Sequence, residues 1–427
     1  MRPPIERSSW SRSVLALACA LALTQLSCVN SSSTWFVPDA GTDASRPPID
    51  AGERDGGELT PDDATRMVLA SVADRVIVPA LRELETRTEA LRAATSRLAT
   101  SGSAEDRAAA REAWLAAMQS WERLEVFTLG PGAAVMGGGL GLRDELYSWP
   151  LVNRCRIDQT TVSADHETAE ALAGESISVR TLGALEYLLF FEEPTNGCTA
   201  TSAINATGQW AALGETEIAR RRAVYARSAA ELVAARATEL RMRWESGVDG
   251  APAFRDELAR AGAGSATYAT AQAGLNALTD ALFYVEIEVK DLKLARPAGL
   301  MECTTTTCPE LLESRWADRS RDHLLANVRA FQSAYLGADP GTDAPGIDDL
   351  LIAVGAAEMD ARMRTALDAA IAALEALDAS LIASLAAGPE QMVAAFMAVK
   401  AATDILKTEI CSVLDLDLPM RAEGDTD

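Results

Sequence analysis

The sequence predicts an all-α protein, folded as two helical bundles that lie side by side. The composition is 48% hydrophobic but only 5% aromatic, and alanine and leucine dominate long runs without Gly or Pro, which favours helices over sheet. No segment has the convincing alternation of apolar and polar residues that a strand requires. The 427 residues are enough for two domains, which we expect to span residues 63–213 and 214–420.

An export signal and a tether are expected before the folded body. Three arginines precede an apolar stretch, 14–26, which is shorter than the roughly 20 residues that a membrane-spanning helix needs. The stretch leads into Leu-Ser-Cys, so residues 1–27 are predicted to be a signal peptide and Cys28 the lipid acceptor. Ordinary signal cleavage is the alternative. Residues 28–62 are rich in Ser, Asp, Gly and Pro, which predicts a disordered tether.

Helix-capping residues and apolar periodicity predict the elements of the folded body. Thr60 and Pro61 supply an N-cap and a first helical position. A glycine-rich loop near residues 130–150 lacks the phosphate-binding pattern of glycine, lysine and serine or threonine. Helices are expected over 63–98, 104–128, the segment 179–193, 220–244, 265–292, 314–336 and, in two or three pieces, 346–416.

The cysteine spacing indicates two disulfides, which an exported protein can form. Of the seven cysteines, Cys303 and Cys308 can close a small local loop, and Cys155 and Cys198 can pair across the helix between them. Cys411 is then left as a buried free thiol. A zinc site is the weaker interpretation, because the chain has no C-x-x-C pair and only two histidines.

Glu186 is the most informative single residue. It is a lone carboxylate in the apolar run VRTLGALEYLLF, where leucines recur at helical spacing. A buried carboxylate has to be paired, hydrogen-bonded, bound to a metal or protonated, because the removal of a charge from water is costly. Glu186 is therefore either a structural anchor that accepts hydrogen bonds or part of a functional site.

The run around Glu186 resembles the signature of the imelysin (peptidase M75-like) family, Gly-x-His-x-x-Glu followed by a Tyr-Leu-Leu-Phe-type tail. The Glu and the tail are present, whereas Thr181 stands at the Gly position and Gly183 at the His position. The resemblance extends through most of residues 63–416. Its further matches are Trp114, Trp121 and Glu125, Arg143 to Trp149-Pro150, Lys293 to Pro297, Glu313-Ser314, and the segment 406–416.

The resemblance implies an exported or lipid-anchored bacterial protein built from two helical bundles and linked to iron uptake. It also implies that the signature residues lie near the junction of the bundles, at a metal or peptidase site. Of the signature His and Glu, this chain retains only the Glu, as Glu186. The expected ligand-binding residues are Glu186, Glu125, Arg143, Trp149 and Trp121, and the candidate ligands for iron or another divalent metal are Glu186 and Glu125.

Two arrangements of these residues are open. A buried pair of Arg143 with Glu186 would lower the pKa of the carboxyl and make it a poor base. Glu125 and Glu186 together would instead bind a hard cation or share a proton. The tryptophans at helical spacing are expected mainly in the core.

Other charged residues are expected to be structural. His166 and Glu170 lie in a very polar segment that is typical of a solvated helix surface, and His323 is expected to be partly buried in a helix. Lys293 is expected to stabilise a helix C-terminus, and Glu286, Glu288 and Lys290 are expected on a solvated face. Glu186 is therefore the one candidate catalytic residue in the sequence.

The favoured function is a non-catalytic binding module in metal or iron acquisition, lipid-anchored through Cys28 on the periplasmic side of the outer membrane. Its expected partners are the membrane and envelope or iron-uptake proteins. The first alternative is a metallopeptidase of the M75 type that uses Glu186 as base or ligand, and the second is a structural envelope scaffold. The scarcity of histidines favours the binding module over the peptidase, because H-E-x-x-H zinc peptidases need two of them on one helix.

Overall fold

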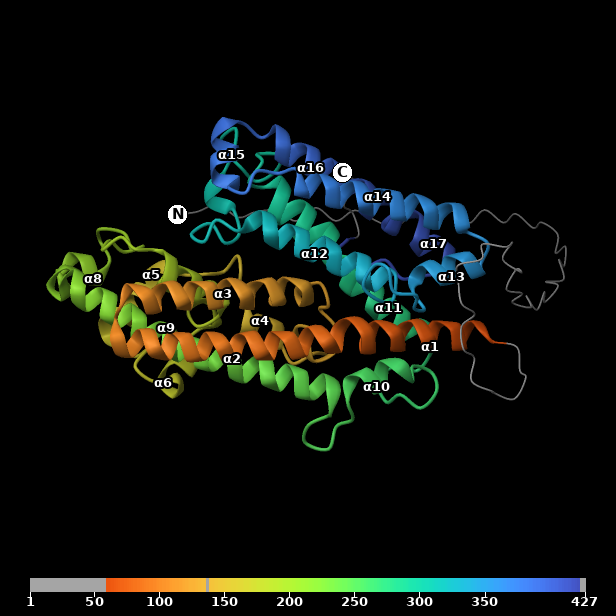
Figure 1. Ribbon diagram of the computed structural model, residues 1–427, viewed down its shortest axis with the longest axis horizontal. Helices are drawn as coiled ribbons and strands as arrows, with labels where there is room; N and C mark the ends of the chain where they lie inside the picture. Colours follow the sequence, from red (N-terminus) through yellow and green to blue (C-terminus); the bar gives the residue numbers. More distant parts are fainter. Residues whose placement is uncertain (1–58, 136–137, 423–427) are drawn as a thin grey trace, which may run out of the picture.

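The computed structural model describes residues 59–135 and 138–422, and all regular elements within these ranges are helices (Figure 1). The predicted all-α class is therefore confirmed. The predicted signal peptide at 1–27, the lipidation of Cys28 and all but the last residues of the tether at 28–62 lie outside the described residues.

A continuous helix opens the fold and runs along both bundles (Figure 1). It comprises α1 (Pro61–Ser71), the π-helical segment η1 (Val72–Ile77) and α2 (Val78–Ser101). As predicted, Thr60 caps it: its hydroxyl accepts from the Asp63 N–H at 3.2 Å, and the Asp63 carboxylate accepts from the Thr60 N–H at 3.3 Å. Pro79 donates no hydrogen bond, and its ring would clash with the carbonyl of an ordinary α-turn. The wider turns of η1 end just before it, so the helix continues.

The first bundle forms around α2. The helices α3 (Ala104–Glu125) and α9 (Gln209–Glu245) pack along α2, and α7 (Leu182–Phe190) packs on both α3 and α9. Short helices cover α9: α4 (Leu142–Leu146), α5 (Arg154–Ser163), α6 (Ala169–Ala173) and α8 (Ala203–Ala206). The 3-10 turns η2 (Gly130–Gly132) and η4 (Ile177–Val179) lie in the connections.

The second bundle forms the upper layer in Figure 1. Its central helices are α12 (Ser320–Tyr335), α14 (Ala357–Glu375), α16 (Glu390–Asp404) and the π-helical η5 (Val285–Ala295), which follows α11 (Ala271–Leu282). In this bundle α14 packs on α16, α16 on η5, and α12 on both α14 and η5. The smaller elements of this bundle are η6 (Pro309–Leu311), α13 (Ile347–Ala353), α15 (Leu381–Ala387), η7 (Ile405–Ile410) and α17 (Cys411–Val413). The short helix α10 (Phe254–Ala259) packs instead on α1 and α9, in the lower layer.

The boundary between the bundles differs from the predicted division into residues 63–213 and 214–420. Residue 214 is a glycine with φ 74° that kinks α9, but the helix beyond the kink packs against α2 and α7. Residues 214–245 therefore lie in the first bundle. The difference has a physical reason: glycine and proline mark where helices end or bend, but they do not show which neighbour a helix packs against.

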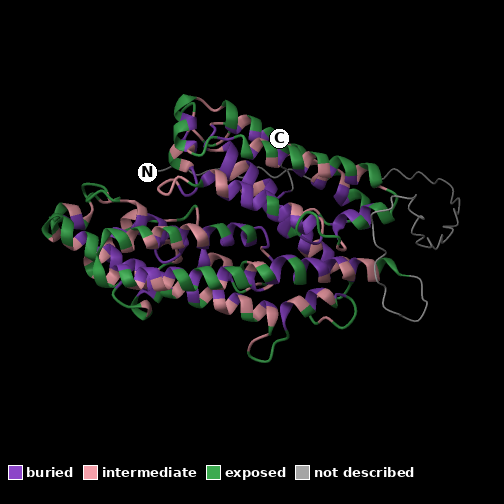
Figure 2. Ribbon diagram, in the orientation of Figure 1, coloured by how far each residue is buried: buried purple, intermediate pink, exposed green. Residues whose placement is uncertain are grey.

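The two bundles share one hydrophobic core. A single contiguous cluster of buried apolar residues extends from Val68 to Ala422 and contains residues of both layers. The layers meet where α3 and η1 pack on α12 and where α1 packs on α11. Much of the ribbon that faces this junction is coloured as buried (Figure 2). Charged groups that lie in the junction are therefore removed from water, which is the condition for a tuned site.

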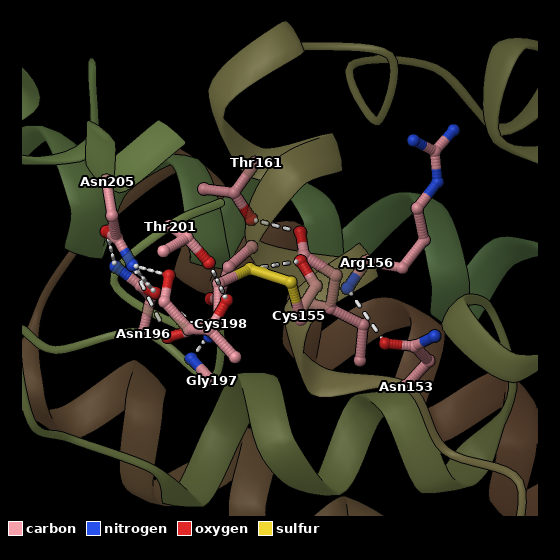
Figure 3. Close-up of a disulfide and its surroundings, with 12 residues drawn as sticks. Asn153, Cys155, Arg156, Thr161, Asn196, Gly197, Cys198, Thr201 and Asn205 are labelled. Carbon is pink, nitrogen blue, oxygen red and sulfur yellow. Dashed lines mark hydrogen bonds between the residues drawn. A yellow bond between two sulfur atoms is a disulfide. The ribbon is translucent and has the colours of Figure 1, made fainter. Parts of the chain in front are cut away.

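Both predicted disulfides are present. Cys155 at the start of α5 pairs with Cys198 in the loop after α7, and Cys303 pairs with Cys308. Cys411 is a free, buried thiol, as expected. Next to the first disulfide, the amides of Asn196 and Asn205 bond each other at 2.8 and 3.1 Å (Figure 3). These bonds and the disulfide fix the long loop that follows the Glu186 helix.

One candidate for a membrane-spanning element occurs among the described residues, and it is not a single helix. Only the pair Leu381–Ala387 and Glu390–Val413 has the combined length and apolar composition, and its two helices are bent by 112° relative to each other.

The two disulfides are expected to differ in their contribution to stability. Cys155–Cys198 joins residues 43 apart and Cys303–Cys308 joins residues 5 apart, so loop-closure entropy gives about 4 and about 2 kcal/mol respectively. We expect urea unfolding of the Cys155→Ser/Cys198→Ser variant to show the larger loss in the free energy of unfolding. An equal or larger loss in Cys303→Ser/Cys308→Ser would contradict the chain-entropy account.

Candidate functional site

A cluster of charged side chains lies buried where the bundles meet. At its centre the Lys293 ammonium donates to Glu122 Oε2 at 2.9 Å, to Glu125 Oε2 at 2.8 Å and to Asn327 Oδ1 at 3.0 Å. Glu313 Oε2 lies 2.9 Å from the same nitrogen. All five side chains are at most 1% exposed. We call these five residues, together with His323, the junction cluster.

Helical spacing explains how the junction cluster assembles. Glu122 and Glu125 lie three residues apart and share one face of α3, and His323 and Asn327 lie four residues apart on α12. These faces are opposed because α3 packs on α12. The Asn327 amide donates to the Glu122 carbonyl at 2.7 Å and to its Oε2 at 3.0 Å, which ties the two helices together.

A second layer of polar groups surrounds the junction cluster. Tyr147 donates its hydroxyl to Glu313 Oε1 at 2.9 Å, and Arg143 donates to Glu125 Oε1 at 2.9 Å. The rings of Tyr284 and Trp149 lie 5.5 and 5.8 Å from the Lys293 nitrogen. Electron-rich ring faces at such distances stabilise a cation, so these aromatic side chains reinforce the charge on Lys293.

His323 is the sixth residue of the junction cluster, and its Nδ1 makes no hydrogen bond to the described residues. This nitrogen lies 3.4 Å from Glu122 Oε1 and 3.7 Å from Glu313 Oε2. Glu122 Oε1 and His323 Nδ1 have no hydrogen-bond partner among the described residues, whereas Glu313 Oε2 pairs with the Lys293 ammonium. The three atoms lie within 4.8 Å of one another.

Burial and neighbouring charges shift the pKa values of the junction cluster in opposite directions. Burial and the nearby Glu313 charge raise the pKa of Glu122 well above its usual value. Burial acts to raise the pKa of Glu313 too, but Lys293 and His323 outweigh it and lower that pKa. For Lys293, burial opposes the charge, and the surrounding carboxylates outweigh burial and raise the pKa well above its ordinary value. The ammonium therefore stays charged.

Glu186 lies on α7 next to the junction cluster and is held by backbone. Its Oε1 accepts hydrogen bonds from the N–H groups of Trp316 at 2.8 Å and Ala317 at 3.0 Å. These residues belong to a turn in which Ser314 and Asp318 have φ of 47° and 53°, a costly conformation for side-chain-bearing residues. Glu186 thus anchors a strained turn of the second bundle to the first.

The two predicted partnerships of Glu186 are not formed. Arg143 pairs with Glu125 rather than with Glu186, and Glu125 is occupied by Arg143 and Lys293. Burial raises the pKa of Glu186 to about 7, and the hydrogen bonds from Ala317 and Trp316 oppose that shift. Of the predicted site residues, Glu125, Arg143 and Trp149 gather around Lys293, and Glu186 lies on the side of Glu313 and His323.

A side chain at the position that resembles the signature His would fit only if Val152 moved. A Cβ on Gly183 would lie 2.6 Å from Val152 Cγ2 and 3.5 Å from Tyr147 Cε2, and atoms at 2.6 Å overlap. Val152 and Tyr147 therefore fill the space in which an imidazole at this position would begin. The imidazole of the junction cluster comes instead from His323, on the opposite bundle.

Among the described residues, a small cavity lies beside part of the predicted ligand cleft around Glu186, Glu125, Arg143 and Trp149. Trp121 is buried and, with Arg143, borders a cavity of only about 20 Å³. An open cavity of about 530 Å³ lies elsewhere and is lined by residues such as Leu129, Phe254 and Tyr268. The polar groups of the junction cluster thus face one another rather than an open cleft.

Several sequence-based assignments were wrong about burial. Glu286 and Lys290 are buried rather than on a solvated face, because η5 has the i→i+5 bonding of a π-helix and its faces do not follow α-helical spacing. Lys293 lies in the last turn of η5, as expected, but it is buried. His166 is buried, with Nδ1 2.9 Å from the Thr160 carbonyl oxygen, while Glu170 is exposed. His323 is 2% exposed rather than partly buried.

Sequence reasoning missed most of the junction cluster as a site. Glu122, Glu313, His323 and Asn327 were not proposed as site residues, and Lys293 was given only a capping role. A signal was available in SWERLEVF and in VKDLKLA, where charged residues fall at apolar helix positions. The charges meet only because α3, α12 and η5 pack together in the folded protein, which the sequence of each element does not show.

Removal of the central ammonium should destabilise the fold strongly. In Lys293→Met the buried carboxylates lose their shared cation, and the loss of one partner of a buried ion pair costs about 3–5 kcal/mol. The measurement is the free energy of unfolding in urea. Arg87→Met is the control, since Arg87 pairs with Glu83 at the surface at 2.6 Å and such pairs contribute about 1 kcal/mol or less. Equal losses in both variants would contradict a central role of Lys293.

The raised pKa of Glu186 should make stability depend on pH. The folded protein keeps this proton up to about pH 7, whereas an unfolded glutamate loses it near 4.5. Its contribution to stability is therefore full below pH 4.5, falls as pH rises through this window and is lost above pH 7, by up to about 3 kcal/mol. We expect Glu186→Gln to remove this decline in urea unfolding at several pH values.

The exposed Glu83→Gln serves as the control for the pH experiment, because Glu83 pairs with Arg87 on an exposed helix face. It should keep the wild-type dependence of the unfolding free energy on pH. Identical pH profiles for Glu186→Gln and wild type would show that Glu186 does not hold a proton in the folded state.

Comparisons with known proteins agree with this architecture. A sequence profile of the imelysin family (peptidase M75) matches residues 77–407. None of the curated proteins matches the chain in sequence. Two solved structures are similar: one described as an iron-regulated protein A precursor from Parabacteroides distasonis, and an imelysin-like protein from Psychrobacter arcticum.

The structural likeness extends over nearly the whole of both neighbours. The first neighbour, from Parabacteroides distasonis, has a TM-score of 0.65 at 18% sequence identity. The matched region covers 85% of this chain and 97% of the neighbour's chain. The second neighbour, from Psychrobacter arcticum, has a TM-score of 0.65 at 19% sequence identity. The matched region covers 84% of this chain and 98% of the neighbour's chain. At these identities the likeness shows a shared fold. Since the family profile matches more than half of its residues, this protein belongs to the imelysin family.

Proposed function

We propose that this protein is an exported, non-catalytic binding module that serves metal or iron acquisition. The observation that carries the proposal is the junction cluster, which brings carboxylates and an imidazole together in a buried place at the meeting of two bundles. Carboxylate and imidazole groups are common protein ligands of divalent metals. The name of one structural neighbour, an iron-regulated protein, supports iron as the relevant metal.

The same geometry argues against peptide hydrolysis. A catalytic metal needs an open coordination position for water and substrate, and the junction cluster is at most 2% exposed at each residue. Glu186 is engaged by two backbone N–H groups, and the position of the signature His is a glycine, which offers no metal ligand or base. A binding role requires neither a peptide cleft nor a free base.

Export and anchoring form part of the proposal. Both disulfides, Cys155–Cys198 and Cys303–Cys308, are suited to an oxidising compartment outside the cytoplasm. The apolar N-terminal stretch and Cys28 support a lipid anchor on the periplasmic side of the outer membrane. In this position the protein would act beside envelope or iron-uptake proteins as its partners.

The test is a combined binding and hydrolysis experiment on the full chain, expressed in an exporting bacterial host with a histidine-free affinity tag and purified without chelators. We expect about one equivalent of bound metal by mass spectrometry, saturable uptake of Fe²⁺ added under anaerobic conditions, and no cleavage of an unfolded protein substrate. Glu186→Gln should leave all three results unchanged, because Glu186 is engaged by backbone.

Two outcomes would contradict the proposal. Peptide-bond cleavage that disappears in Glu186→Gln and persists in Glu83→Gln would establish a peptidase instead. Failure of the protein to take up Fe²⁺, Zn²⁺ or Ca²⁺ would exclude metal acquisition and leave a role as an envelope scaffold.

A further inference from the structure

We propose that Glu122, Glu313 and His323 form a binding site for one divalent transition-metal cation, such as Fe²⁺ or Zn²⁺, across the junction of the bundles. This inference rests on the proposed function and names the site and the class of metal. It differs from a site built on Glu186 and the signature position, because its imidazole is supplied by α12 of the second bundle.

The distances among the three candidate ligand atoms suit a single ion. His323 Nδ1 lies 3.4 Å from Glu122 Oε1 and 3.7 Å from Glu313 Oε2, and all three atoms lie within 4.8 Å of one another. A transition metal with bonds of about 2.0–2.2 Å places neighbouring ligand atoms about 3.0–3.6 Å apart in octahedral or tetrahedral geometry. Small side-chain rotations would therefore bring the three atoms onto one centre.

Unpartnered atoms give a second, independent reason to expect a ligand. Glu122 is fully buried and His323 is 2% exposed, yet Glu122 Oε1 and His323 Nδ1 have no hydrogen-bond partner among the described residues. Buried polar atoms in folded proteins nearly always have one. A cation between them would satisfy both atoms at once and would also bind Glu313 Oε2.

Lys293 already occupies part of this region, and the geometry leaves room for both cations. Its ammonium contacts Oε2 of Glu122, whereas the proposed metal ligand is Oε1 of the same carboxylate. Glu313 Oε2 is the shared atom, 2.9 Å from the ammonium. Glu125 and Asn327 hold the ammonium on its other sides, at 2.8 and 3.0 Å. The lysine thus orients the carboxylates while the metal is absent.

The ligand set selects the class of metal. An imidazole favours Zn²⁺, Fe²⁺ and other transition metals, whereas Ca²⁺ takes six to eight oxygen ligands. The candidate ligand set here includes one imidazole nitrogen beside a carboxylate oxygen from each of Glu122 and Glu313. We therefore expect Fe²⁺ and Zn²⁺ to bind in preference to Ca²⁺.

The proposed metal would also link the bundles. Glu122 belongs to α3 of the first bundle, whereas Glu313 and His323 belong to the second. A ligand that binds the folded state stabilises it by mass action. The melting temperature should therefore rise when Zn²⁺ is added, and EDTA should reverse the rise.

Because the chain contains only two histidines, NMR of the histidine ring nitrogens can test the proposed site directly. The full chain, with a histidine-free tag, is labelled with ¹⁵N in its imidazoles and titrated with Zn²⁺, a diamagnetic probe. We expect the ring-nitrogen signals of one histidine to shift and to saturate at one equivalent. The signals are assigned with His166→Gln, in which the shifting histidine should remain.

Affinity measurements on variants provide the second readout. The Zn²⁺ affinity should fall at least about 100-fold in His323→Gln and in Glu122→Gln, since the loss of outer-shell partners alone costs about 10–100-fold. His166→Gln is the matched control, because His166 is also buried but bonds the Thr160 carbonyl, and it should bind as wild type. Circular dichroism checks that each variant is folded.

The outcomes separate this inference from the proposed function. Stoichiometric metal binding with both imidazoles unshifted would overturn the site and leave the binding module intact. A protein that binds neither Zn²⁺ nor Fe²⁺ would overturn both. Should His323→Gln fail to fold, the labelled wild-type chain and His166→Gln still decide the question.

Discussion

The buried ammonium of Lys293 is the interaction on which the rest of this structure depends. It lies 2.8–2.9 Å from carboxylate oxygens of Glu122, Glu125 and Glu313, two on α3 and one in the turn before α12. Without a shared cation, three carboxylates could not all stay ionised together in a place removed from water. The ion network therefore fixes how the two bundles meet. It also leaves one oxygen of Glu122 and one nitrogen of His323 without partners, so the same network that holds the fold creates a place for a ligand.

The surroundings of Gly183 explain how the chain accommodates a glycine at the position of the signature His. Gly183 lies against Val152 and Tyr147, and a Cβ at this position would overlap a methyl group of Val152. Tyr147 in turn donates to Glu313, a member of the junction cluster. The retained Glu186 accepts from the backbone of the turn that follows Glu313. The glycine, the tyrosine and the glutamate thus support one arrangement, in which the imidazole comes from α12.

The architecture around this junction has identifiable causes. One helix, residues 61–101, runs through both bundles because the π-helical turns of η1 accommodate Pro79. Its two ends pack on different partners, α11 at the start and α3 and α9 further on. A single apolar core results, and relative motion of the bundles would have to break it together with the ion network. The disulfide Cys155–Cys198 restrains the loop after the Glu186 helix at the edge of the first bundle (Figure 3).

The sequence by itself determined the helical class, the cap at Thr60, both disulfides, the free Cys411 and the burial of Glu186, because these depend on local propensity, spacing and the cost of burying charge. The tertiary structure alone decided that α9 packs in the first bundle, that Arg143 pairs with Glu125, and that Glu122, Lys293, Glu313 and His323 meet. These contacts join residues up to about 200 positions apart, for example Glu122 and His323. Periodicity within one helix shows which face is buried, but the charge that lies opposite is set by the packing of another helix.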